Sequence, residues 1–511
     1  MTLRQRFDDA INPIVVKELR QAVRGRFVVT VITLSLIAQL VAVAVLAVTA
    51  RINMDNINAQ PVGLGAFMTI FTLLFTACIF FVPMHSGFRM AAERSDTNVD
   101  LLFITTIRPR TIVLGKLFTA LALVCLLFSS SLPFLVFAYV LRGIDFLSIA
   151  YVLVFALVII GSQAILSLFA ACIPVSKPFK LLLAFALFIG TFMLYAPTLA
   201  VATEVMRLGV TIVYQDKDAM TVTLAVGGAL LTFDVLMLIV TTAMITPAAA
   251  NRALPIRLSL ALLWCVSAAA GVATMITARS VVPLALWAAM QLGLLTLVLM
   301  SAIGERETWG PRVARTIPRS HLKRTLAFLF YSGGAGGTLW ALGFMGLTVA
   351  CYYIAGSYAA RLDYYDALGS HLSNAALCVA GYALAALLLR RTLLQRIPPR
   401  VTWAIALLLF LLGAIVPPLV TFLFWTETPE FPMYFQYATI FNPFPSSTEQ
   451  PADWRTLVLS IWAGVMLLAN VEWMKRQARG FKPLECGGKA AALKAVAEAT
   501  ALQSYVELTN E

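Results

Sequence analysis

Long runs of apolar residues, separated by short polar segments, dominate the pattern along the chain. A helix that crosses a bilayer needs about 20 apolar residues, and twelve runs approach or exceed that length. In the first half they are Val28–Ala50, Val62–Met84, Ile112–Leu141, Leu147–Ile173, Phe179–Val201 and Thr221–Ile245. In the second half they are Ile256–Ala278, Val281–Ile303, Thr338–Ile354, Ser373–Leu389, Val401–Trp425 and Trp454–Val471. The pattern predicts an all-α polytopic membrane protein with about twelve transmembrane helices.

The composition excludes a soluble enzyme and a disordered chain. Of the 511 residues, 60% are hydrophobic and only 12% are charged, whereas an ordinary globular domain has about 25% charged residues. The net charge is +13. In a membrane protein such an excess points first to Lys and Arg in cytoplasmic loops, so we expect no nucleic-acid partner.

The basic residues are sorted between alternate connections. If the N-terminus is cytoplasmic, the cytoplasmic segments and their adjoining span ends hold 31 of the 38 Lys and Arg residues. The opposite side holds seven basic and eleven acidic residues. This distribution predicts that both the N-terminus and the C-terminus are cytoplasmic.

Residues 1–27 precede the first span and carry apolar side chains at three- and four-residue spacing, with Lys17 and Arg20 on the other faces. Asn12 followed by Pro13 is a helix start signal. We therefore expect a cytoplasmic amphipathic helix on the inner membrane surface. We expect no cleaved signal peptide, because the first membrane helix can direct insertion.

The remaining chain divides into three parts by this pattern. Residues 28–246 form a first six-span domain, residues 247–471 form a second one, and residues 472–511 form a cytoplasmic tail. The three histidines are far apart and the cysteines have no paired spacing, which argues against a metal centre. No Gly-x-x-x-x-Gly-Lys-Ser/Thr motif is present, so the sequence predicts no catalytic, metal-binding or cofactor-binding site in this chain.

The predicted cytoplasmic connection 85–111 mixes charged residues, such as Glu93 and Arg94, with apolar residues, such as Leu102 and Phe103. A short helix with these residues would have a charged side and an apolar side. It would suit a protein partner or, as an alternative, would merely lie at the lipid headgroups.

This region resembles the membrane subunits of ATP-binding-cassette (ABC) exporters of the type-2 permease superfamily, over about residues 11–246. The matching residues are Glu93-Arg94, Thr97, Asp100-Leu101-Leu102, Pro109, and Ile112 through Gly115-Lys116. The family usually has Glu-Arg-Glu and then Gly-Thr, whereas this chain has Ser95 and Asp96 at the differing positions.

The resemblance implies that Glu93 to Phe103 is a coupling helix, which docks on a separate ABC-type ATPase subunit present in two copies. The implied docking residues are Glu93, Arg94, Thr97, Asp100, Leu101, Leu102 and Phe103. ATP and Mg²⁺ would then bind to the partner, and this chain would not be an enzyme. The resemblance also implies a multi-pass protein of the bacterial inner (plasma) membrane, which pairs with itself or with another permease.

A second basic connection, residues 304–324, follows the eighth span and begins with Glu305, Arg306 and Glu307. Its position mirrors the first loop, which suggests a diverged repeat with a second docking site. An even number of spans in each half would give both copies the same orientation, as a parallel repeat requires. The alternative is a basic loop that only obeys the charge rule, with a short chance match.

Asp234 and Gln163 are polar residues inside predicted spans. Asp234 lies near the middle of the sixth span, where a carboxylate is costly and by default marks function. The structural alternative is a hydrogen bond to Gln163 of the fourth span or to a neighbouring hydroxyl. A lone intramembrane acid does not favour a proton-driven pump.

Two predicted outer segments complete the pattern. The resemblance implies that residues 202–220 form short helices that cap the transport pathway. The aromatic residues of 426–453 suit an interfacial belt or a lid over substrate. We therefore expect an ABC exporter membrane subunit. The alternatives are a twelve-span ion-coupled secondary transporter and a membrane scaffold that transports nothing.

Overall fold

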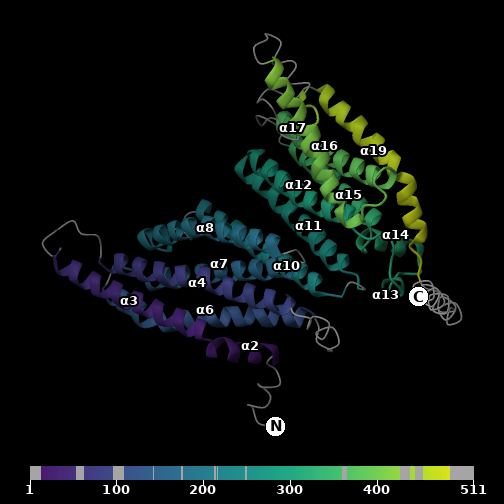
Figure 1. Ribbon diagram of the computed structural model, residues 1–511. Helices are drawn as coiled ribbons and strands as arrows, with labels where there is room; N and C mark the ends of the chain where they lie inside the picture. Colours follow the sequence, from purple (N-terminus) through teal and green to yellow (C-terminus); the bar gives the residue numbers. More distant parts are fainter. Residues whose placement is uncertain are drawn as a thin grey trace, which may run out of the picture. The chain divides into compact units, whose positions relative to one another are not determined.

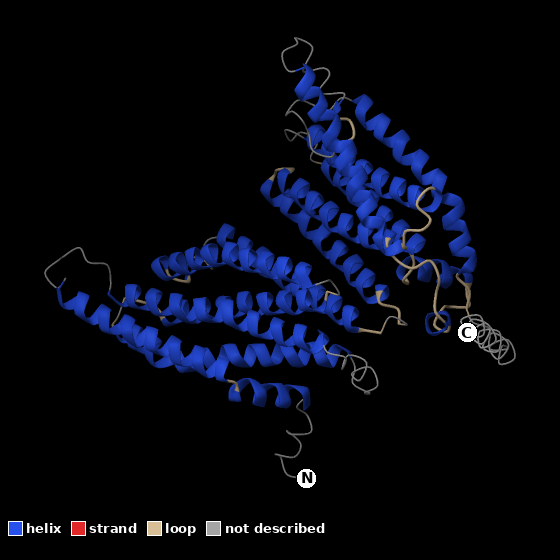
Figure 2. Ribbon diagram, viewed as in Figure 1, coloured by secondary structure: helices blue, strands red, loops and turns tan. Residues whose placement is uncertain are grey.

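The computed structural model describes residues 13–52, 62–95, 109–141, 143–173, 177–211, 215, 217–247, 250–358, 365–425, 438–442 and 453–483. In these residues the chain forms helices and connecting turns, without strands (Figures 1 and 2). Twelve of these helices are long and apolar enough to cross a membrane. Each of the twelve predicted apolar runs lies mainly within one of them, so the all-α polytopic fold class is confirmed.

The helices belong to two compact units, residues 1–247 and 248–511. The first unit contains α2 (Pro13–Arg24), α3 (Arg26–Ile52), α4 (Val62–Ser95), α6 (Pro109–Val140), α7 (Phe146–Cys172), α8 (Lys177–Leu208) and α10 (Lys217–Ile245). The second contains α11 (Ala253–Ala278), α12 (Val282–Ile303), α13 (Pro311–Ala314), α14 (His321–Phe330), α15 (Gly334–Ser357), α16 (Tyr365–Thr392), the 3₁₀ helix η1 (Pro399–Val401), α17 (Thr402–Trp425) and α19 (Asp453–Gly480).

The core of the first unit lies along α4, which packs mainly on α6 and α7. Phe67, Phe71 and Phe75 recur every four residues on one face of α4 and are almost fully buried. Their rings stack in sequence, and the series ends on Tyr195 of α8, 5.7 Å from Phe75 between ring centroids. This face fixes α8 against α4 although most of α8 is exposed to the surroundings.

In the second unit, α12 packs mainly on α15, and α16 packs mainly on α19. If the long helices of each unit are numbered as spans one to six, every principal pair of packed spans in the second unit is also packed in the first. These pairs are 1–2, 2–3, 2–4, 2–5, 3–4, 3–6, 4–5 and 4–6. The two units therefore share one order of helix packing.

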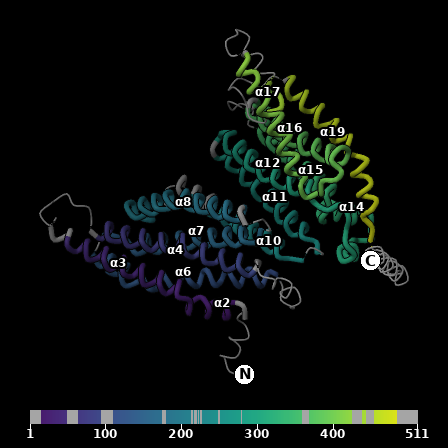
Figure 3. The backbone as a smooth tube through the Cα atoms, viewed as in Figure 1, coloured from purple at the N-terminus to yellow at the C-terminus, as the bar shows by residue number. Residues whose placement is uncertain are grey.

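A short helix packs against the first and third spans in both units. In the first unit it is α2, which precedes the first span and contacts α3 and α6 (Figure 3). In the second unit it is α14, which lies between the second and third spans in sequence and contacts α11 and α15. Corresponding places in the two bundles are thus filled from different places in the sequence.

The close approach of α14 to α15 depends on glycine. A Cβ at Gly336 would lie 2.0 Å from the backbone oxygen of Phe328, and a Cβ at Gly337 would lie 2.2 Å from Nη2 of Arg257. Backbone atoms cannot move away from such a contact cheaply, so a side chain at Gly336 would force the two helices apart.

Several helices extend beyond the predicted apolar runs. The second span was predicted to end at Met84, but α4 continues to Ser95 through Pro83. Likewise α8 continues to Leu208 instead of ending at Val201, and α19 continues to Gly480 instead of Val471. Hydropathy detects the part of a helix that lies in hydrocarbon, whereas the helix itself can continue into water with polar residues.

Candidate functional site

A buried cation, Lys116, connects three helices at one end of the first unit. Its Nζ lies 2.7 Å from Oε2 of Glu93 on α4 and 3.2 Å from Oε1 of Glu18 on α2. Arg89 adds a second cation, with Nη2 3.5 Å from Glu18 and 2.5 Å from Oε1 of Gln21. The side chains of Lys116 and Glu18 are only 4% and 7% exposed, whereas Glu93 is 42% exposed.

Helical spacing explains why these residues meet. Arg89 and Glu93 are four residues apart on α4, and Glu18 and Gln21 are three residues apart on α2, so each pair lies on one helix face. Lys116 lies in the second turn of α6, among the buried residues Ile112, Val113 and Leu117. A cation at such a position requires compensating charge, and the two glutamates provide it.

The charges of this cluster set the protonation of Glu18. Burial by itself would raise the pKa of the Glu18 carboxyl, but the charges of Lys116 and Arg89 outweigh it and hold the pKa below the ordinary value of 4.5. Glu18 is therefore ionised near neutral pH, and α2 is held to α4 and α6 by full charges.

The structure corrects the predicted start of the coupling segment. Residues 85–95 belong to α4, so Glu93 and Arg94 lie in its last turn and not in a separate loop helix. The helix continues here because Ser86 and Met90 are buried against the bundle. The other implied docking residues, Thr97, Asp100, Leu101, Leu102 and Phe103, lie outside the described residues.

The second unit has its own charge cluster at the end of its second span. Nη2 of Arg257, on α11, lies 2.6 Å from Oε1 of Glu305, which follows α12. The same guanidinium donates from Nη1 to the carbonyls of Leu329, at 3.1 Å, and Tyr331. Oε2 of Glu305 accepts a hydrogen bond of 2.6 Å from the backbone N–H of Gly333. Arg257 is only 2% exposed, and it fixes the end of α14 and the start of α15.

Glu307 continues this cluster by pairing with Arg390 of α16. The neighbouring Arg391 donates a 3.0 Å hydrogen bond from Nη1 to Oδ1 of Asn470 on α19 and lies over the Trp473 ring, 5.2 Å from its centroid. The predicted docking residues Glu305 and Glu307 therefore form ion pairs within the unit. Arg306, between them, is exposed.

An exposed surface with mixed character follows on α13, α14 and the turn between them. Leu322 and Leu326 lie one turn apart on α14 and are 76% and 55% exposed. The exposed basic residues of this surface are Arg312, Arg315, Arg319 and Lys323. Two exposed leucines beside four cations suit an acidic partner surface or anionic lipid headgroups.

Asp234 and Gln163 do not bond to each other. Oδ2 of Asp234 accepts a 2.7 Å hydrogen bond from Ser162 of α7. Gln163, which is 4% exposed, accepts instead a 3.3 Å hydrogen bond from Thr191 of α8. Oδ1 of Asp234 is buried without a hydrogen-bond partner in the described part of the chain.

The sequence patterns did not single out Glu18, Arg257 or Arg390 as members of charge clusters. One signal was available, because Lys116 and Arg257 each lie close to one end of an apolar run. A cation at such a position commonly pairs within the protein. Its partners, however, come from other helices and are not visible in one sequence. Comparison with known proteins adds no relative, since no family model, curated protein or solved structure matches the chain.

Proposed function

We propose that this multi-pass membrane protein is the transmembrane subunit of an ABC exporter, driven by a separate ATPase that docks on its cytoplasmic segments. Its twelve apolar helices indicate a protein of the transport type. We infer that the two units are diverged repeats, because every principal pair of packed spans in the second unit is also packed in the first. The expected setting is the bacterial inner membrane, with two ATPase subunits carrying ATP and Mg²⁺ and with self-pairing or pairing to a related permease.

The observation that carries this proposal is the position of Lys116. The segment 96–108 follows Glu93 and precedes α6, which contains Lys116. The ion pair between Glu93 and Lys116 therefore joins the two helices, α4 and α6, on either side of this segment. A displacement of that segment by a docked subunit would be transmitted to α4 and α6 together. Through Glu18 it would also reach α2. A direct connection to several spans is what a transmission element requires.

The first test separates coupling from assembly. In Glu93→Ala and Leu102→Asp, ATP hydrolysis by the co-purified complex should no longer drive export, while membrane insertion is preserved. Leu208→Asp is the control, because Leu208 is 57% exposed and is the last residue of α8, in the predicted outer segment and away from the predicted coupling segment. If both variants export normally and retain the same ATPase, the coupling role is wrong.

A second test locates the partner directly. A photoreactive amino acid at Leu102 or Leu322 should cross-link to an ATPase that contains a phosphate-binding loop, whereas the same residue at Leu208 should not. Cross-linking at Leu102 alone would restrict docking to the first unit and leave 304–324 as a basic loop. If no such ATPase is captured at any position, the ABC assignment fails.

The two alternatives give different results in reconstituted vesicles. A secondary transporter would export without ATP and would stop when ionophores collapse the ion gradient. A scaffold would show neither ATP-dependent nor gradient-dependent transport. The proposed exporter requires ATP on the side that carries the coupling segments.

A further inference from the structure

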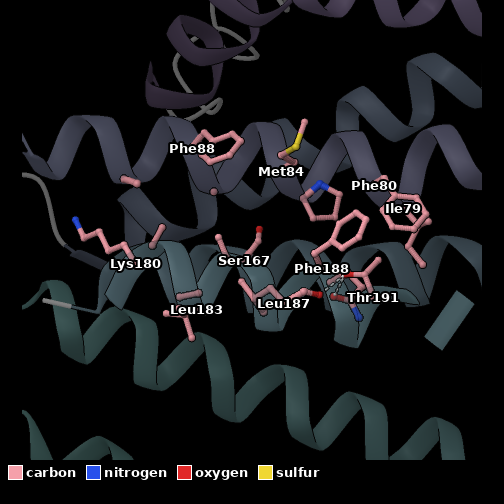
Figure 4. A pocket seen from close by; sticks show the side chains of 17 residues that line it. Ile79, Phe80, Met84, Phe88, Ser167, Lys180, Leu183, Leu187, Phe188 and Thr191 are labelled. Atoms are coloured by element: carbon pink, nitrogen blue, oxygen red, sulfur yellow. Dashed lines mark hydrogen bonds between the residues drawn. The ribbon is translucent and has the colours of Figure 1, made fainter. Parts of the chain in front are cut away.

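A cavity of about 250 Å³ lies within the first unit between α4, α7 and α8 (Figure 4). Its walls are formed by one face of α4 from Ile79 to Ala91, by residues 163–171 of α7 and by one face of α8 from Lys180 to Thr191. A dry cavity of about 150 Å³ already holds a benzene molecule. The volume here is therefore sufficient for a larger apolar group.

The hydroxyl and amide oxygens in the cavity wall are already hydrogen-bonded within the protein. Thr191 donates to Gln163 at 3.3 Å and to the carbonyl of Leu187 at 2.8 Å. Ser167 donates to the carbonyl of Ala164 at 2.8 Å and lies 3.2 Å from Ser86. The rest of the wall is apolar apart from the amide nitrogen of Gln163 and the side chain of Lys180. The cavity thus favours a hydrocarbon chain over a polar solute.

Lys180 gives the cavity one charged end. Figure 4 shows Lys180 at one end of the row of lining side chains and Ile79 and Phe80 towards the other. Lys180 is half-buried and forms no ion pair within the described residues. It lies in the first turn of α8, which begins at Lys177, and an anion is favoured at a helix N-terminus.

The length of the cavity matches the depth of one membrane leaflet. From Lys180 to Thr191 the helix rises roughly 16 Å, at 1.5 Å per residue. Half of the hydrocarbon core of a bilayer is about 15 Å. A lipid whose headgroup lies at Lys180 could therefore extend one acyl chain along the whole cavity.

The cavity is accessible from the hydrocarbon side. Met84, Phe88 and Phe188 line it and are 42%, 61% and 57% exposed. An acyl chain can enter sideways between such residues without passing through water. A water-soluble ligand would have to cross this apolar rim, which opposes it.

We propose that this cavity binds a membrane phospholipid with an anionic headgroup, whose acyl chain lies between α4, α7 and α8 and whose headgroup contacts Lys180. The proposal does not depend on the exporter assignment, because it concerns binding in the first unit whatever the protein transports. The bound lipid would fill a space that otherwise leaves α8 attached to α4 mainly through the Tyr195 end.

The experiment is native mass spectrometry of the full chain in detergent, titrated with phosphatidylglycerol or with phosphatidylcholine of the same acyl chains. The wild-type protein should bind phosphatidylglycerol at least about fivefold more tightly, and Lys180→Ala should remove that preference while Lys180→Arg retains it. Arg110→Ala is the matched control, because Arg110 is an exposed cation in the first turn of α6. An equal preference in wild type and Lys180→Ala would overturn the proposal.

Two further measurements test the acyl chain. Ala184→Phe adds bulk to the cavity wall at an exposed position and should weaken binding of both lipids. If Ala184→Phe does not fold, Ala171→Phe adds bulk to the cavity wall from α7 and should likewise weaken binding of both lipids. A photoreactive acyl chain bound to the unmodified protein should label residues 79–91 or 183–191. Labelling confined to other residues would refute the site. Normal lipid binding in both phenylalanine variants would also refute it.

Discussion

The charge clusters of the two units compensate a buried cation in two different ways. In the first unit a lysine on the third span lies between two carboxylates, one on the short helix and one at the end of the second span. In the second unit an arginine on the first span binds one carboxylate and two backbone carbonyls. The first cluster therefore joins helices through side chains, whereas the second also fixes the backbone between α14 and α15.

This difference follows from the cations themselves. Lysine is a compact charge that can approach carboxylates from several directions, whereas the planar guanidinium presents five donors in fixed directions. The first cluster can rearrange by exchanging partners, since Arg89 already stands 3.5 Å from Glu18. In the second cluster, Arg257 is the one cation among the described residues that forms an ion pair with Glu305. We infer that the first unit is suited to movement at this end and the second to rigidity.

The largest effect is expected from Arg257→Met. The change leaves Glu305 without its cation and leaves the carbonyls of Leu329 and Tyr331 without their donor, which should lower the free energy of unfolding by about 3–5 kcal/mol. Unfolding in mixed detergent micelles measures it, with the exposed Lys323→Met as control. Equal stability of the two variants would contradict the rigid role of this cluster.

Lys116→Met should destabilise less, by about 2–3 kcal/mol, because Glu93 is partly exposed and Arg89 still neutralises Glu18. The same unfolding assay measures it. Lys116→Arg keeps the charge and should restore most of the stability. If Lys116→Met costs more than Arg257→Met, the order inferred for the two clusters is wrong.

Acid should loosen the first cluster through Glu18. The pKa of Glu18 is lower in the folded protein than the ordinary 4.5, so its contribution to stability is present above about pH 4.5. That contribution is lost as the pH falls through the folded-state pKa. Thermal unfolding between pH 6 and pH 3 should therefore show a smaller loss in Glu18→Gln than in the wild type. Parallel pH profiles would exclude Glu18 as a source of this dependence.

Asp234→Asn should have the smallest effect, below about 1 kcal/mol on unfolding, because an amide oxygen can still accept the hydrogen bond from Ser162. ATP-dependent export should be unchanged. Loss of transport with normal stability would favour the ion-coupled alternative and would move the functional centre away from both clusters.

The spans were predictable because twelve apolar runs of membrane length leave few alternatives. Their ends were less predictable, since the residues between Met84 and Ser95 look like a loop by hydropathy but are held in α4 by burial of Ser86 and Met90. Glu93 was singled out as a docking residue of a coupling helix, and that role stays a prediction. Its ion pair with Lys116 could not be foreseen, because it joins residues from different helices.

Pro83 lies in α4, the helix that both lines the cavity and carries Glu93 of the charge cluster. Proline has no N–H to donate, so α4 lacks the main-chain hydrogen bond to the carbonyl of Ile79 at this point. Pro83 also lines the cavity. Glu93 lies ten residues further along, roughly 15 Å at 1.5 Å per residue. A change of about 20° in the bend at the proline would thus swing Glu93 by roughly 5 Å. We infer that the last three turns of α4 can act as a lever whose pivot is in the wall of the cavity, so an occupant of that cavity would influence the angle of the lever.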